Sequence, residues 1–316
     1  MEENQEIKKE LDVYRYYWAV PAFFLFILIN YFTKRIHLES LDMNLMISIV
    51  SFLFGFLITI TFSMLLTRIS ALKENLASET GRLVGLFLLS KHLGKEFHEK
   101  IKKKIDDYTI NTLRNYTNYD VSREQLYGMY DDIENIEIKN QSQEAIANSF
   151  LYILGELEPI REKLEYLTGR RVEKSLKISN YVLGILLMAL LFLNRGETFT
   201  NAIFIVLSTI IVFIILIIED YDHLKIGDYT YNISNSEQLF DLLQKDRYYP
   251  QYVLNRTPLI PGKKYRIGIF DKKTKQEKIY LMQYNPSFKR KIASLLKKVN
   301  SNLRSQFSTP QFVFYY

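Results

Sequence analysis

The stretch Thr198–Ile218 reads TFTNAIFIVLSTIIVFIILII and contains no Asp, Glu, Lys or Arg. A helix that crosses a bilayer needs about 17 to 25 predominantly apolar residues. The stretches Tyr16–Thr33, Asn44–Thr67 and Ile178–Asn194 are equally free of charge. A buried core helix or a parallel strand is the alternative for each of them. Four such stretches in one chain nevertheless predict four transmembrane helices, arranged as two hairpins.

The averages over the whole chain point to a different class of protein. The 316 residues are 48% hydrophobic and 24% charged, with a mean hydropathy of -0.07. Such values are typical of a soluble globular protein of about two domains. The averages mix very different segments, however, and the charge-free stretches overturn the soluble class.

The predicted fold is a mainly α membrane protein with four segments. Residues 1–67 hold the N-terminal segment and the first hairpin, and residues 68–177 form a helical cytoplasmic domain. Residues 178–227 form the second hairpin, and residues 228–316 a basic cytoplasmic tail with a β-hairpin and a helix. Lys and Arg are enriched on the cytoplasmic side of membrane proteins. Their distribution predicts a multi-pass protein of the cell membrane with both termini in the cytoplasm, although the Lys34–Arg35 pair conflicts with this orientation.

The cytoplasmic segment reads as helical. Apolar residues recur at helical spacing from Arg68 to Asp107, and again from about Ser142 to Leu167, where Pro159 kinks the helix or marks a boundary. Its charges nearly balance, which is typical of solvated helices.

The tail carries the basic excess of the chain. Residues 228–316 contain 16 Lys plus Arg against 6 Asp plus Glu, a net charge of +10, compared with +6 for the whole chain. Lys264–Phe270 and Glu277–Tyr284 are predicted to pair as a hairpin, and Ser287–Arg304 to form a basic amphipathic helix. The tail either binds anionic membrane lipid or simply keeps the surface soluble.

Several chemistries are missing from the sequence. Without cysteine there is no thiolate metal site, cysteine nucleophile or disulfide. The patterns GxGxxG, GxSxG and HExxH and the Walker loop are absent, and the four histidines are scattered. We therefore expect neither an enzyme nor a nucleic-acid-binding protein.

The second charge-free stretch has one small and polar face. At about 100° per residue, Ser48, Ser51, Gly55, Thr59 and Ser63 share a sector with Phe62, and Leu66 lies below them. Such a face either packs closely against another helix or lines a pore. In a pore, Phe62 and Leu66 would form an apolar gate near the cytoplasmic end.

The fourth charge-free stretch ends in an acidic cluster. Glu219, Asp220 and Asp222 follow it directly, although negative charge is unfavourable at a helix C-terminus. Compensation comes either from Arg or Lys of the middle segment, in a salt-bridged junction, or from a cation. Calcium, which prefers oxygen ligands, is the candidate cofactor.

The arrangement resembles the bestrophin-like membrane proteins, and more narrowly a prokaryotic branch of them. In that branch the second helix ends in a pattern like FGFLITITFSMLLTRISALKENLASETG, here residues 54–81 with Ser63, Arg68 and Glu79. The fourth helix ends in D-x-D-x-x-x-x-G, here Asp220, Asp222 and Gly227. The resemblance covers roughly residues 16–240.

This resemblance implies a homo-oligomeric ion channel, pentameric in bestrophins and usually conducting chloride or other anions. The neck of the family's pore maps onto Thr59, Phe62 and Leu66, its calcium clasp maps loosely onto the acidic cluster, and Arg68 becomes an ion-attracting or lipid-facing cation. Animal members carry a longer acidic run and repeated aromatics in the neck, where this chain has Gly55 and Thr59, and these departures leave selectivity and calcium control open. The implied partners are membrane lipid, small inorganic ions and further copies of the chain. The alternative is a non-conducting membrane sensor or scaffold that acts through the basic tail.

Overall fold

The computed structural model describes residues 15–34, 42–114, 122–224, 228–254, 259–271 and 276–284. The described chain is mainly helical and divides into two compact units. Unit 1 comprises residues 1–75 and 166–229, and unit 2 comprises residues 76–165 and 230–316. Two long helices, α3 (Met43–Ser90) and α6 (Gln141–Gly169), contribute residues to both units.

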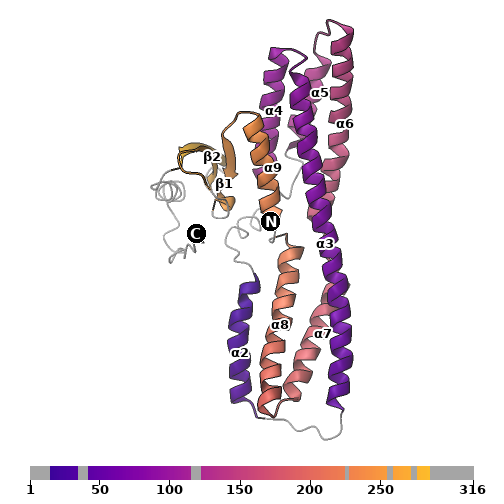
Figure 1. Cartoon of the computed structure of the whole chain (residues 1–316), viewed down its shortest axis with the longest axis vertical. Coiled ribbons are helices and arrows are strands. Elements are labelled where there is room, and N and C mark those ends of the chain that lie inside the picture. Colours follow the sequence, from indigo (N-terminus) through magenta and orange to yellow (C-terminus); the bar gives the residue numbers. More distant parts are fainter. Residues whose placement is uncertain are drawn as a thin grey trace. The chain divides into compact units, whose positions relative to one another are not determined.

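Unit 1 is a helical bundle. It contains the short 3-10 helix η1 (Arg15–Trp18), α2 (Ala19–Phe32), the first part of α3, α7 (Lys174–Leu193) and α8 (Thr198–Asp222). In Figure 1, α8 lies between α2 and α7 and contacts both of them. Gly184 brings α7 close to its neighbours, because a Cβ there would lie 3.0 Å from Ile215 Cδ1 and 3.3 Å from a ring carbon of Phe54.

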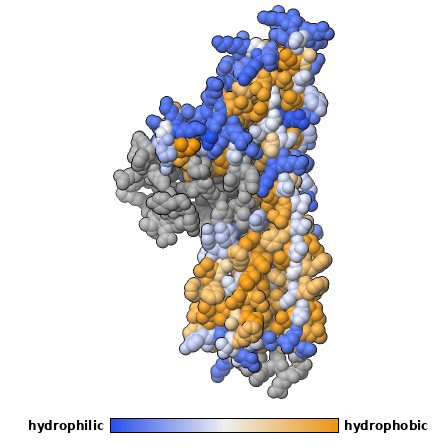
Figure 2. Space-filling view, in the orientation of Figure 1, coloured by the Kyte–Doolittle hydropathy of each residue, from blue (hydrophilic) through white to orange (hydrophobic). Residues whose placement is uncertain are grey.

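Among the residues that the structure describes, three helical segments are long and apolar enough to cross a membrane: Met43–Ser90, Gln141–Leu193 and Thr198–Asp222. Figure 2 shows apolar side chains over the outer surface of unit 1, as expected for a surface in contact with lipid. The helix predicted from Tyr16 to Thr33 is present as η1 and α2, but α2 has only 14 residues. That length is below the about 17 residues of a spanning helix, so the fourth span stays a prediction.

Unit 2 packs helices of the middle segment around one apolar core. They are the second part of α3, α4 (Lys95–Arg114), α5 (Arg123–Glu134) and most of α6. Leu86, Ile101, Met129, Phe150 and Leu154 are among the core residues.

The helix predicted from Arg68 to Asp107 is interrupted, because Gly94 adopts a positive φ of 115° between α3 and α4. Pro159 lies inside α6, so the alternative that it marks a boundary is wrong.

The tail adds α9 (Asp228–Leu242) and a three-stranded sheet to unit 2. The strands are β1 (Arg247–Pro250), β2 (Lys264–Asp271) and β3 (Gln276–Gln283), in the order β1-β2-β3, with the 3-10 helix η3 (Gln251–Val253) after β1. β2 and β3 are antiparallel, with Phe270 opposite Glu277, which confirms the predicted pairing. β1, which the sequence did not predict, runs parallel to β2. The predicted helix Ser287–Arg304 lies outside the described residues.

Ion pairs join the described part of the tail to the rest of unit 2. Arg266 of β2 binds both oxygens of Asp106 on α4, at 2.6 and 2.7 Å. Arg114 of α4 pairs with Glu277 of β3 at 2.5 Å, and within the tail Arg247 pairs with Glu237 and Asp241 of α9. These arginines serve the fold, and the sheet is therefore part of the compact unit.

Candidate functional site

The small and polar face of α3 points away from the chain's own bundle. Ser48, Ser51, Gly55, Thr59 and Ser63 are all exposed in the single chain. The adjoining side of the helix, with Val50, Phe54, Ile58 and Leu65, is buried against α7 and α8. A Cβ added at Gly55 would meet no atom within 4 Å. The face is therefore open in the single chain, and lipid, a further copy or a pore can lie against it.

The hydroxyls on this face are satisfied within their own helix. Ser48 Oγ donates to the carbonyl of Asn44, and Thr59 Oγ1 to the carbonyl of Gly55, both at 2.8 Å. A hydroxyl bonded to the preceding turn can face lipid or a narrow apolar passage without a large desolvation cost.

The two predicted gate residues differ in position. Leu66 is 54% exposed on the same side as the polar face. Phe62 is half-buried and packs edge-on against Tyr221 of α8, with the ring centres 6.2 Å apart. Leu66 is therefore the more accessible of the two to anything outside the chain, and the gate role of both stays a prediction.

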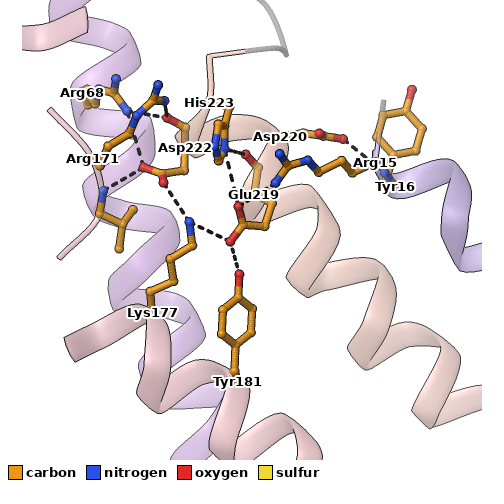
Figure 3. A network of polar contacts seen from close by, with 11 residues as sticks. Arg15, Tyr16, Arg68, Arg171, Lys177, Tyr181, Glu219, Asp220, Asp222 and His223 are labelled. Atoms are coloured by element: carbon orange, nitrogen blue, oxygen red, sulfur yellow. Dashed lines mark hydrogen bonds and ion pairs between the residues drawn. The ribbon is translucent and has the colours of Figure 1, made fainter. Parts of the chain in front are cut away.

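The acidic end of α8 lies in a network of cationic side chains, all within unit 1 (Figure 3). Lys177 lies between two carboxylates, 2.7 Å from Glu219 Oε1 and 3.0 Å from Asp222 Oδ2. Glu219 also accepts hydrogen bonds from Arg15, at 2.9 Å, and from the hydroxyl of Tyr181. These contacts correspond to the salt-bridged junction that the sequence offered as one alternative.

Asp222 holds the loop between α6 and α7. Its Oδ1 accepts a hydrogen bond of 2.7 Å from the backbone amide of Val172, and its backbone carbonyl accepts from Arg68 and Arg171. The two guanidinium groups therefore place positive charge at the C-terminal end of α8, where the helix dipole is negative.

Arg68 is buried and 7% exposed. Its guanidinium donates to the carbonyls of Leu167 and Thr168, at 2.7 and 3.1 Å, and to that of Asp222 at 3.0 Å. Arg68 thus caps the ends of α6 and α8 together. This contact set gives it a structural role, and its predicted role of attracting ions or facing lipid stays a prediction.

Asp220 differs from its two neighbours. It is fully buried, and its Oδ2 accepts a hydrogen bond of 3.1 Å from the backbone amide of Tyr16 in η1. Its Oδ1 has no hydrogen-bond partner among the residues that the structure describes. Asp220 therefore fixes the N-terminal segment to the end of α8.

The charges of this cluster nearly cancel. The carboxylates of Glu219, Asp220 and Asp222 face the cations Arg15, Arg68, Arg171 and Lys177. Burial lowers the pKa of His223 below its usual value, against the opposing hydrogen bond to the Glu219 carbonyl, so His223 is largely neutral at pH 7. Within the described ranges, no three His, Asp or Glu side chains are grouped as a metal ion would require. Calcium binding stays a prediction.

Sequence reasoning expected cations from the middle segment, and Arg68, Arg171 and Lys177 are such residues. It missed Arg15 and Tyr181. Arg15 lies 204 positions before Glu219, and no local pattern joins the two.

The comparisons with known proteins agree with this architecture. No curated protein and no solved structure matches the chain. The family model of the Bestrophin-like domain matches residues 18–230, which contain α2 to α8 and the whole charged cluster apart from Arg15 and Tyr16. That match covers well over half of the chain, and the protein is therefore a member of the bestrophin-like family.

Proposed function

We propose that the chain forms a homo-oligomeric ion channel, a pentamer that favours anions, with a pore lined by the exposed polar face of α3. The observation that carries the proposal is the exposure of Ser51, Gly55 and Thr59 on a membrane-length helix. Lipid-facing positions of membrane helices are mostly large and apolar, whereas this face carries glycine and hydroxyl side chains. Membership of a family of channels supports the same conclusion.

In the proposed assembly, α3 helices from several copies surround the pore, and unit 2 lies on the cytoplasmic side together with both termini. The protein lies in the cell membrane, and its transmembrane part consists of α2, the first part of α3, α7 and α8. Leu66 and Phe62 form an apolar constriction that closes the pore by excluding water.

The channel is tested with purified full-length protein in flux liposomes and planar bilayers. Mass measurement in detergent should give a pentamer, and permeability ratios for chloride, sodium and potassium should favour the anion. A monomer, or liposomes that stay tight under varied voltage, calcium and lipid, would contradict the proposal. Selectivity for cations would contradict only the anion preference.

The constriction is tested with Leu66→Ala and Phe62→Ala. Each should raise the current, because a smaller side chain admits water to the neck. Met64→Ala is the matched control, since Met64 is also exposed but lies on another side of α3. If Leu66→Ala leaves the current unchanged, or if Met64→Ala raises it equally, the constriction does not lie at this position.

Calcium control is a separate part of the proposal. Asp220 is the carboxylate to test, because one of its oxygens has no partner among the described residues. If calcium acts here, its effect on flux should disappear in Asp220→Asn and persist in the exposed control Glu197→Gln.

The rival function is a scaffold that acts through its basic tail. A truncation that tests it has to begin after Tyr284, because β2 is fixed to α4 through Arg266 and Asp106. The channel should still assemble and conduct after this truncation, whereas a scaffold should lose its activity.

A further inference from the structure

Three helices of unit 2 meet at a buried carboxylate, that of Glu79 on α3. Glu79 lies beyond the charge-free stretch that ends at Thr67, and it is 6% exposed. Leu76 and Leu83, about one turn before and after it along α3, are both buried. Its carboxylate accepts a hydrogen bond from the hydroxyl of Tyr108 on α4, which is itself almost fully buried.

The nearest positive charge comes from the third helix. Arg161 of α6 acts on Glu79 electrostatically, and its guanidinium carbon lies 5.6 Å from the centre of the Tyr108 ring. Arg161 also donates to Ser122 Oγ at 3.1 Å. Glu79, Tyr108 and Arg161 therefore form one cluster, defined here as the junction cluster.

Two charged residues close in sequence to Glu79 and Tyr108 have partners of their own. On α3, Arg82 pairs with Glu156 of α6 at 2.7 Å, and on α4, Asp106 pairs with Arg266. Arg161 lines a cavity of about 120 Å³ that α5 and α6 form, and the other lining residues are Arg123, Tyr127, Glu158, Glu162 and Glu165. The carboxylates of this cavity also attract Arg161. The positive charge of Arg161 is therefore shared between Glu79 and these carboxylates.

We propose that Glu79 is a proton-binding site that makes the contact between α3, α4 and α6 depend on pH near neutrality. Neutral Glu79 fits its apolar surroundings with one hydrogen bond from Tyr108. When the proton leaves, the Tyr108 hydroxyl and Arg161 stabilise the buried anion, and the attraction draws Arg161 away from the cavity carboxylates. Protonation thus selects between two charge arrangements of the junction cluster.

The electrostatics of the site agree with this assignment. Burial raises the pKa of Glu79 from the ordinary 4.5 to about 7, while the Tyr108 hydrogen bond and the charge of Arg161 lower it. Because the pKa of Glu79 is higher in the folded than in the unfolded state, the folded protein binds this proton more tightly. The resulting stabilisation of the fold is complete below pH 4.5 and is lost as pH rises from about 4.5 to about 7. Over that window the unfolding equilibrium constant should rise by up to roughly 300-fold.

The test is a pH titration of the full-length protein in nanodiscs, followed by the infrared carbonyl band of neutral carboxylic acids. Wild-type protein should lose one such band near pH 7, and Glu79→Gln should lack it. Glu162→Gln, which removes an exposed carboxylate next to Arg161, should retain it. If no band titrates above pH 6, or if Glu162→Gln removes it, the proposal is overturned.

A second variant tests the role of Tyr108 without removing the carboxylate. Tyr108→Phe deletes the hydrogen bond that favours the anion, so the midpoint of the band should move to higher pH. An unchanged midpoint, or one moved to lower pH, would contradict the cluster. Hydrogen exchange of α3, α4 and α6 should increase above pH 7 in wild-type protein but not in Glu79→Gln. None of these measurements depends on conduction, so they stand apart from the channel proposal.

Discussion

Replacing Arg68 with methionine should destabilise unit 1. The effect should be larger than that of replacing any other arginine on the surface of unit 1 or at the acidic end of α8. Methionine is an unbranched apolar side chain that keeps part of the packing and removes every donor. The carbonyls of Leu167 and Thr168 then lose the partners that they have at 2.7 and 3.1 Å, while the carbonyl of Asp222 keeps Arg171. A hydrogen bond to a charged group contributes about 1.5 to 3 kcal/mol, so two of them give about 3 to 6 kcal/mol.

The assay is denaturant unfolding in detergent, followed by circular dichroism of the helices. Arg170→Met is the matched control, since Arg170 is exposed and its guanidinium only lies over the Tyr166 ring, 5.7 Å from its centre. That variant should lose less than about 1 kcal/mol. Arg68→Lys should fall between the two, because lysine keeps the charge but not the planar fork of donors. Equal losses for Arg68→Met and Arg170→Met would refute the capping role.

Two further substitutions test the packing of each unit. Gly268→Ala should destabilise unit 2 by about 1 to 3 kcal/mol in chemical unfolding, because the new Cβ would clash with the hydroxyl of the buried Tyr248. Gly81→Ala is the control and should not destabilise the unit, since a Cβ at Gly81 on α3 would lie in open space. A stable Gly268→Ala protein would show that the sheet can shift. In unit 1, Asn180 Nδ2 donates to Thr61 Oγ1 at 2.7 Å between α7 and α3. Thr61→Val should lower the free energy of unfolding by about 1 to 3 kcal/mol, because it leaves the amide of Asn180 without its partner. The double variant with Asn180→Leu should recover part of this loss. If thermal melts show that the two single losses simply add in the double variant, the pairing is contradicted.

The elements that rest on local patterns could be predicted from the sequence. Absence of charge over about 20 residues predicts membrane-length helices because each helix satisfies its own backbone hydrogen bonds. The structure has such helices at the second, third and fourth stretches. The β2–β3 pairing was also predictable, since alternating strands next to each other in sequence pair locally. β1 could not be predicted. It has only four residues, and it pairs in parallel with β2, so a crossover segment must separate the two strands in the sequence and no local hairpin pattern marks them.

The candidate site divides in the same way. The sequence predicted the polar face of the second helix and the need for cations around Glu219, Asp220 and Asp222. It could not give Arg15 as a partner, because that pairing depends on how η1 meets α8. Glu79 appeared in the sequence only as part of a motif, and its burial beside Tyr108 and Arg161 became visible in the folded unit.

Sequence alone therefore determined the membrane class, the positions of the apolar helices and the periodicity that puts small and polar residues on one side of α3. These properties depend on composition and spacing within a single helix. Only the tertiary structure decided that this side faces away from the bundle, that the acidic end of α8 is neutralised by arginines and a lysine, and that Glu79 is buried. The physical reason is that burial and charge pairing are set by residues far apart in the chain, whose meeting depends on the packing of several helices at once.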